Sequence, residues 1–264
     1  MKKTLALLNS FSVLFVIGIN YIAQAQRFNN TTVGELSKTY DNLFTPATYA
    51  FTIWILIFSG LIAYSIYQIR NAFFKPEKTA HIKQTGYWFF IANLLTGSWV
   101  LVFTYEHFGI SVLIMLGIVF SLSKIVINTQ MERWDAPIGI IAFVWWPICL
   151  YIGWISVATI ANFSIYLTKI NWEGFGISNI TWTIIMVIVA VLLNLFMIAK
   201  RNMREFALVG AWALTAIYVR HNEDYNSIAY TALTGAIVLI LAASIHAFLN
   251  RATNPATKFL ERFS

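Results

Sequence analysis

The chain of 264 residues is 59% hydrophobic and 16% aromatic, but only 11% of its residues are charged. Soluble domains carry about 25% charged residues, so this composition predicts an integral membrane protein. The net charge of +7 could suggest nucleic-acid binding, but basic and aromatic residues are not interleaved as base stacking requires. The single cysteine, Cys149, excludes a disulfide framework and a cluster of cysteine metal ligands.

Apolar windows predict the helices. A helix needs about 20 apolar residues to cross a bilayer, and windows of that size predict eight transmembrane helices in an all-α protein. The predicted spans are 4–22, 46–69, 85–105, 109–128, 136–167, 178–199, 206–220 and 228–249. The first span has an alternative interpretation, because Lys2, Lys3 and the sequence AQAQ at 23–26 resemble a signal peptide. Cleavage of 1–25 therefore stays open.

The basic residues predict the orientation of the chain. With the N-terminus in the cytoplasm, thirteen lysines and arginines lie on the inside and four on the outside, which agrees with the positive-inside rule. The inside residues are Lys2, Lys3, Arg70, Lys75, Lys78, Lys83, Arg133, Lys200, Arg201, Arg204, Arg251, Lys258 and Arg262. The outside residues are Arg27, Lys38, Lys169 and Arg220.

A polar and aromatic stripe interrupts the fifth span in the sequence YIGWISVATIAN. Within an arc of about 80° on a helix lie Tyr151, Trp154, Ala158 and Asn162. An amide in hydrocarbon needs a hydrogen-bond partner or a cavity beside it. The stripe is therefore either a contact between helices or the wall of a ligand pocket.

The second and third spans favour the pocket. The sequence FTPATYAFTIWILIF begins its helix at Thr45-Pro46, because proline in the first turn sacrifices no needed hydrogen bond. Its aromatic face holds Phe51, Trp54 and Phe58, and the third span adds Asn93 and Trp99. Such a site suits a flat hydrophobic molecule.

The connection at 27–43 is polar and has no sustained apolar period. We expect it to fold over the outer mouth of the bundle as a lid that is more mobile than the helices.

At these residues the chain resembles a known family. TPATYAFTIWILIF resembles the PP-x-W-x-F-x-x-x-W-x-x-L-Y signature of the tryptophan-rich sensory protein family, also called translocator protein, peripheral benzodiazepine receptor or TspO/MBR. LYIGWISVATIAN resembles its fifth-helix pattern P-Y-x-x-W-x-x-x-A-x-x-x-N. The chain departs from these patterns at Thr48 and Thr96, where the family has tryptophan, and at Leu150, where it has proline.

The resemblance implies a domain organisation. Residues 1–167 are expected to form a five-helix ligand-binding bundle, 168–250 three additional transmembrane helices, and 251–264 a cytoplasmic basic tail. The residues after 167 lie outside the resemblance and suggest longer, eight-helix bacterial relatives. We therefore expect a multi-pass protein of a bacterial-type inner (plasma) membrane with both termini cytoplasmic.

The resemblance also implies a function. The family binds tetrapyrroles (porphyrins and haem), and some members bind sterols and synthetic lipophilic ligands. The prediction is a receptor or sensor for a flat lipophilic ligand. A small-molecule transporter and an enzyme that degrades the bound tetrapyrrole, with Trp154 or Trp54 as a redox-active ring, are the alternatives.

The expected partners are a lipophilic small molecule and the lipid bilayer, with no nucleic acid and with a homodimer left open. The cofactor is unknown beyond a porphyrin or haem as ligand. The expected ligand-binding residues are Phe51, Trp54, Phe58, Asn93, Trp99, Tyr151, Trp154, Ala158 and Asn162.

Enzyme motifs do not emerge from the sequence. It has no H-E-x-x-H, no G-x-S-x-G, no glycine-rich phosphate loop and no paired membrane carboxylates. Glu106-His107 is interpreted as a solvated turn, and His246, at membrane depth, as a neutral imidazole bonded to a neighbouring helix. We expect no catalytic and no metal-binding residues, and the sequence leans against an enzyme.

Overall fold

The computed structural model describes residues 1–40 and 42–250, and every regular element in this part of the chain is helical. The predicted basic tail, 251–264, lies outside the described residues. The chain divides into two compact units. Unit 1 comprises Met1–Thr45, Ile53–Thr129 and Ala158–Trp172; unit 2 comprises Pro46–Thr52, Gln130–Val157 and the described residues from Glu173 onward.

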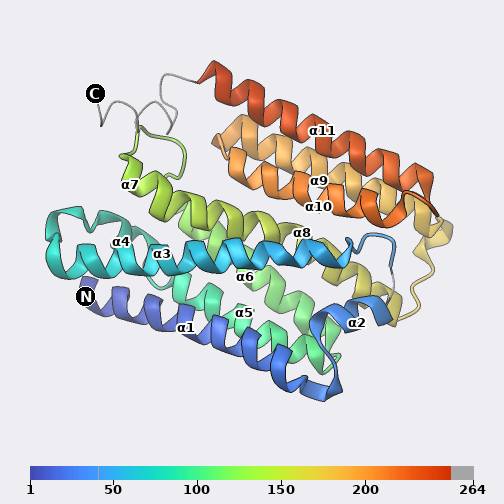
Figure 1. Ribbon diagram of the computed structural model, residues 1–264, viewed down its shortest axis with the longest axis horizontal. Helices are drawn as coiled ribbons and strands as arrows, with labels where there is room; N and C mark the ends of the chain where they lie inside the picture. Colours follow the sequence, from blue (N-terminus) through green and yellow to red (C-terminus); the bar gives the residue numbers. More distant parts are fainter. Residues whose placement is uncertain (41, 251–264) are drawn as a thin grey trace. The chain divides into compact units, whose positions relative to one another are not determined.

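Unit 1 is a helical bundle in which α1 packs against α3 and α5, and α5 packs against α6 (Figure 1). Its helices are α1 (Lys2–Gln26), α2 (Val33–Thr39), α3 (Ile53–Phe74), α4 (Ala80–Thr85), α5 (Trp88–Thr104) and α6 (Phe108–Asn128), together with the end of α8 (Trp146–Lys169). A Cβ atom at Gly97 would lie 2.5 Å from the Phe15 ring. The glycine therefore lets α1 and α5 approach closely, as small residues do in membrane bundles.

Unit 2 holds three long helices that pack on one another, α9 (Asn179–Arg201), α10 (Arg204–His221) and α11 (Asn226–Leu249) (Figure 1). It also holds α7 (Ile138–Ile140), the π-helical turn Ile141–Trp145 and the first part of α8. Glycines again mark the close contacts. A Cβ at Gly153 would lie 3.1 Å from the Phe206 carbonyl oxygen, and one at Gly210 would lie 2.5 Å from the Asn194 side chain.

The short segment 46–52 belongs to unit 2 because of its contacts with α10. The Ala47 N–H donates to the Ala216 carbonyl at 3.1 Å, and Trp212 Nε1 donates to the Ala50 carbonyl at 3.1 Å. We expected the second helix to begin at Pro46, but a 3₁₀ turn, Thr48–Thr52, precedes α3. Packing therefore groups 46–52 and 130–157 with the last three helices. The sequence predicted a division at residue 167 into a ligand-binding bundle and three additional helices. That division is one of function, and it stays a prediction.

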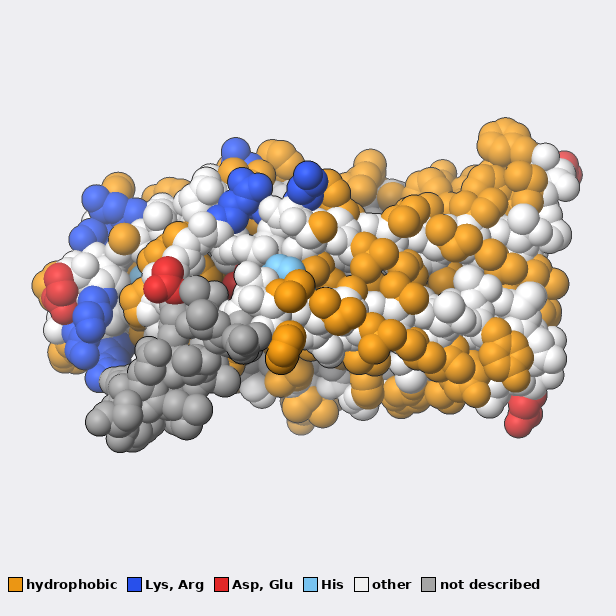
Figure 2. Space-filling view, turned by 90° about the horizontal axis from the view of Figure 1, so that it is seen from above, with side chains coloured by type: hydrophobic (Ala, Val, Ile, Leu, Met, Phe, Trp, Pro, Cys, Tyr) orange, Lys and Arg blue, Asp and Glu red, His pale blue; other side chains and the backbone are white. Residues whose placement is uncertain are grey.

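The membrane character follows from six helical segments, among the described residues, that are long and apolar enough to cross a bilayer. They are Lys2–Gln26, Thr48–Phe74, Phe108–Asn128, Ile138–Lys169, Asn179–Arg201 and Asn226–Leu249. A seventh would be the pair Pro76–Thr85 and Trp88–Thr104, which is bent by 50°. Hydrophobic side chains accordingly cover much of the face in Figure 2.

The predicted count of eight spans is not confirmed. The segment 206–220 is helical, but α10 is only 18 residues long and includes Arg204, Glu205 and Arg220. Three charges in so short a helix make it too polar for the length and composition that a span requires. The protein is an all-α, multi-pass membrane protein with six or seven candidate spans in the described part of the chain.

Candidate functional site

A buried polar chain crosses unit 1 and includes Asn93. The Asn93 Nδ2 of α5 donates to Ser12 Oγ of α1 at 3.0 Å. Asn9, also on α1, donates from Nδ2 to Gln68 Oε1 at 3.1 Å. All four side chains are buried. The Oδ1 atoms of Asn93 and Asn9 are enclosed and have no hydrogen-bond partner among the described residues. These acceptors are available to a water molecule or a ligand, because buried polar atoms are rarely left unpaired.

Two predicted site residues, Trp99 and Asn162, meet in unit 1. The Trp99 Nε1 donates to Asn162 Oδ1 at 3.4 Å, and Asn162 Nδ2 donates to Ser111 Oγ at 2.9 Å. Sequence reasoning missed Ser111. A lone serine in an apolar helix is a weak signal, because its hydroxyl often bonds its own helix, as Ser111 Oγ does with the Phe108 carbonyl at 2.8 Å.

The predicted lid contains a short helix that packs on aromatic side chains. Leu36 of α2 lies in a buried cluster with Phe103, Phe108 and Ile165, and Trp99 borders the same cluster. Thr32 caps α2 and forms a capping box with Glu35. The pattern T-x-x-E could have predicted this helix from the sequence. The α2 helix therefore packs beside Trp99, which bonds Asn162.

Several hydrogen bonds attach the predicted lid to the rest of unit 1. The Tyr40 hydroxyl donates to the Glu106 carboxylate, and Lys169 Nζ donates to the Glu106 carbonyl at 2.7 Å. Asn29 Nδ2 donates to the Thr104 carbonyl at 3.1 Å. Glu106 lies in a partly exposed turn, and it also joins the predicted lid to the α5–α6 turn and to α8.

The same contacts shift two pKa values. The hydrogen bond from Tyr40, supported by Lys169, holds the pKa of the Glu106 carboxyl below its usual value. The pKa of Tyr40 is raised by that bond, by burial and by the nearby negative charge. Glu106 therefore stays ionised and Tyr40 stays protonated across the neutral pH range.

The aromatic residues of the predicted site, from the second and fifth predicted spans, are divided between the units. In unit 1, Trp54 and Phe58 lie with ring centroids 5.0 Å apart. In unit 2, the Phe51 ring meets Trp154 edge-on, with centroids 5.8 Å apart. Trp154 and Tyr151 are buried and belong to unit 2.

The remaining stripe residue, Ala158, is partly buried and belongs with Asn162 to unit 1. Of the nine predicted site residues, unit 1 therefore holds Trp54, Phe58, Asn93, Trp99, Ala158 and Asn162, and unit 2 holds Phe51, Tyr151 and Trp154.

The helices, the buried amides and the lid define a helical membrane protein with a polar and aromatic interior. A model of the TSPO-like protein family matches residues 6–245. The match covers most of the chain, so the chain belongs to the TSPO-like family. It also includes α9 and α10, although we expected the residues after 167 to lie outside the resemblance. Searches of curated proteins and of solved structures found no match.

Proposed function

We propose that the protein binds a flat lipophilic ligand, such as a tetrapyrrole, in unit 1 and acts as a receptor or sensor in a bacterial-type inner membrane. The observation that carries the proposal is the position of the lid. Leu36 packs in the cluster that Trp99 borders, and Trp99 bonds Asn162. An aromatic group with an amide beneath a closing segment is what a ligand of this class requires.

The chemistry of the aromatic and amide side chains in unit 1 suits a tetrapyrrole. Aromatic rings stack on a flat macrocycle, and an amide can accept the N–H groups of a free-base porphyrin. Asn162 shares its amide with Trp99 and Ser111, so a ligand could exchange for one of these contacts at small cost. Asn93 Oδ1 supplies a further buried acceptor in the same unit.

The test is a titration of the purified full-length protein with protoporphyrin IX in darkness, followed by the visible absorption of the porphyrin. Trp99→Phe removes the indole N–H and narrows the stacking face. We expect affinity to fall about tenfold, equivalent to about 1.4 kcal/mol. Trp182→Phe is the matched control, because it removes an indole N–H that bonds the Gly174 carbonyl in unit 2. Equal affinity of the two variants would contradict the site.

The same sample separates the proposal from its alternatives. A binding protein leaves the porphyrin spectrum intact when the bound sample is illuminated, apart from the bleaching that free porphyrin also shows. A degrading enzyme would bleach it faster and yield a new pigment. Movement of porphyrin into proteoliposomes would instead favour a transporter.

A further inference from the structure

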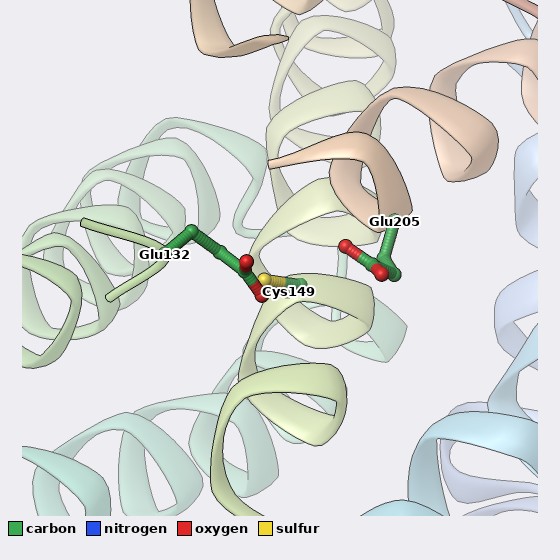
Figure 3. Close-up of side chains that lie close together, drawn as sticks. All are labelled: Glu132, Cys149 and Glu205. Atoms are coloured by element: carbon green, nitrogen blue, oxygen red, sulfur yellow. The ribbon is translucent and has the colours of Figure 1, made fainter. Parts of the chain in front are cut away.

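Unit 2 contains a group of sulfur and carboxylate side chains that the proposed function does not use. Glu132, Cys149 and Glu205 each offer one donor atom, and these atoms lie within 4.8 Å of one another (Figure 3). The residues come from the turn before α7, from α8 and from the first turn of α10. Met131 adds a second sulfur, because its Sδ lies 3.7 Å from Cys149 Sγ.

The group is enclosed, and one of its donor oxygens is unsatisfied. Cys149 and Met131 are fully buried. Glu205 is partly buried, and its Oε2 atom is enclosed with no hydrogen-bond partner among the described residues. Glu205 also forms no ion pair within the part of the chain that the structure describes. An enclosed carboxylate oxygen without a partner is costly, and a bound cation would remove that cost.

Hydrogen bonds hold the contributing segments together. Asn202 Nδ2 donates to the Glu132 carbonyl at 2.7 Å, and Asn202 Oδ1 lies 3.1 Å from His246 Nε2 of α11. The Arg133 guanidinium donates to the Lys200 carbonyl at 3.1 Å. The turn at 130–133 is thereby tied to the end of α9 and to the connection that leads into α10, whose first turn carries Glu205. The sequence predicted that His246 bonds a neighbouring helix; its partner is Asn202, which directly follows the end of α9.

We propose that Glu132, Cys149 and Glu205 bind a zinc ion. A thiolate with two carboxylates is a donor set for a borderline divalent cation. Donor atoms around tetrahedral zinc lie about 3.3–3.8 Å apart, so the two glutamate side chains would move inward by about 1 Å. The thiol proton is released on binding, and the ion offsets two of the three negative charges of the two carboxylates and the thiolate. The site links α8 and α10 to the turn that carries Glu132. The single cysteine in the sequence did not predict such a site.

The test uses Co²⁺ as a spectroscopic probe on tag-free, full-length protein. Thiolate ligation of Co²⁺ produces a charge-transfer band in the near ultraviolet, which carboxylate sites lack. We expect one Co²⁺ per chain with this band, and displacement of the probe by Zn²⁺. Cys149→Ser should abolish the band, and Glu205→Gln should weaken Co²⁺ binding at least tenfold. Glu223→Gln, at an exposed acid of unit 2, should change neither.

Several results would overturn the proposal. The first is Co²⁺ bound without the band, or bound equally by wild type and Cys149→Ser, which would indicate an adventitious ion only. The second is a protein that binds Cu⁺ but not Zn²⁺. That result would mean that the two sulfur atoms of Cys149 and Met131 bind the metal without the glutamates. The third is unchanged binding in Glu205→Gln. This variant alters the partly exposed edge of the group, so it reports on the site even where Cys149→Ser does not fold.

Discussion

Tyr40 donates its hydroxyl to the carboxylate of Glu106, and this bond joins the connection at 27–43 to the turn between α5 and α6. The Tyr40 ring also meets Phe108 edge-on, with centroids 4.8 Å apart. Lys169 completes the group from the end of α8. If this connection opens as the proposed lid, these contacts must break.

Tyr40→Phe should loosen the lid without unfolding the bundle. The ring contact with Phe108 is retained, and the lost hydrogen bond should cost about 1 kcal/mol. Amide hydrogen exchange in 27–43 should accelerate about fivefold, whereas exchange in α5 should not change. Tyr105→Phe is the matched control, because Tyr105 is an exposed neighbour of the same turn. If both variants behave like the wild type, the bond does not hold the lid.

The lid should also respond to pH at its extremes only. The pKa of Glu106 is lowered, so its contribution is present above the usual carboxyl value and is lost as pH falls through the lowered pKa, below about pH 4.5. The pKa of Tyr40 is raised, so its contribution is present below pH 10 and is lost as pH rises through the raised value. Exchange in 27–43, corrected for the intrinsic rate, should therefore be flat from about pH 5 to 9. Glu106→Gln should remove the acidic transition; a transition near pH 7 would refute this assignment.

Ala158→Leu distinguishes a cavity from a helix contact. In a cavity, the added side chain should block protoporphyrin IX while the free energy of unfolding changes by less than about 1 kcal/mol. In a tight contact it should overpack and destabilise by about 1–3 kcal/mol. Ala190→Leu is the comparison and should show this destabilisation, because Ala190 is buried within α9. Early melting of Ala158→Leu to the same degree would make the stripe a packing surface.

The orientation can be tested by cysteine labelling. We expect a membrane-impermeant maleimide added from the periplasmic side to modify Lys38→Cys and to leave Lys78→Cys untouched. Both positions are exposed, so the difference reports the side of the membrane rather than burial. The native Cys149 is buried and should give little background. The opposite pattern would overturn the orientation that the basic residues predict.

The sequence by itself determined the helices and the class of protein. All eight predicted segments are helical, because the transfer of apolar residues into a bilayer depends on local composition. It also marked the amides Asn162 and Asn93 as side chains that need polar partners. That requirement is local, since an amide in hydrocarbon is costly wherever it lies.

Only the tertiary structure decided which partners these groups take. Asn93 bonds Ser12, which lies 81 positions away, and Tyr40 bonds Glu106, which lies 66 positions away. The structure also assigned 46–52 to unit 2, because Trp212 and Ala216 of α10 bond its backbone. Helical period and hydropathy describe neighbours within a few turns. Pairings between distant segments depend on how whole helices pack, and no local pattern records that choice.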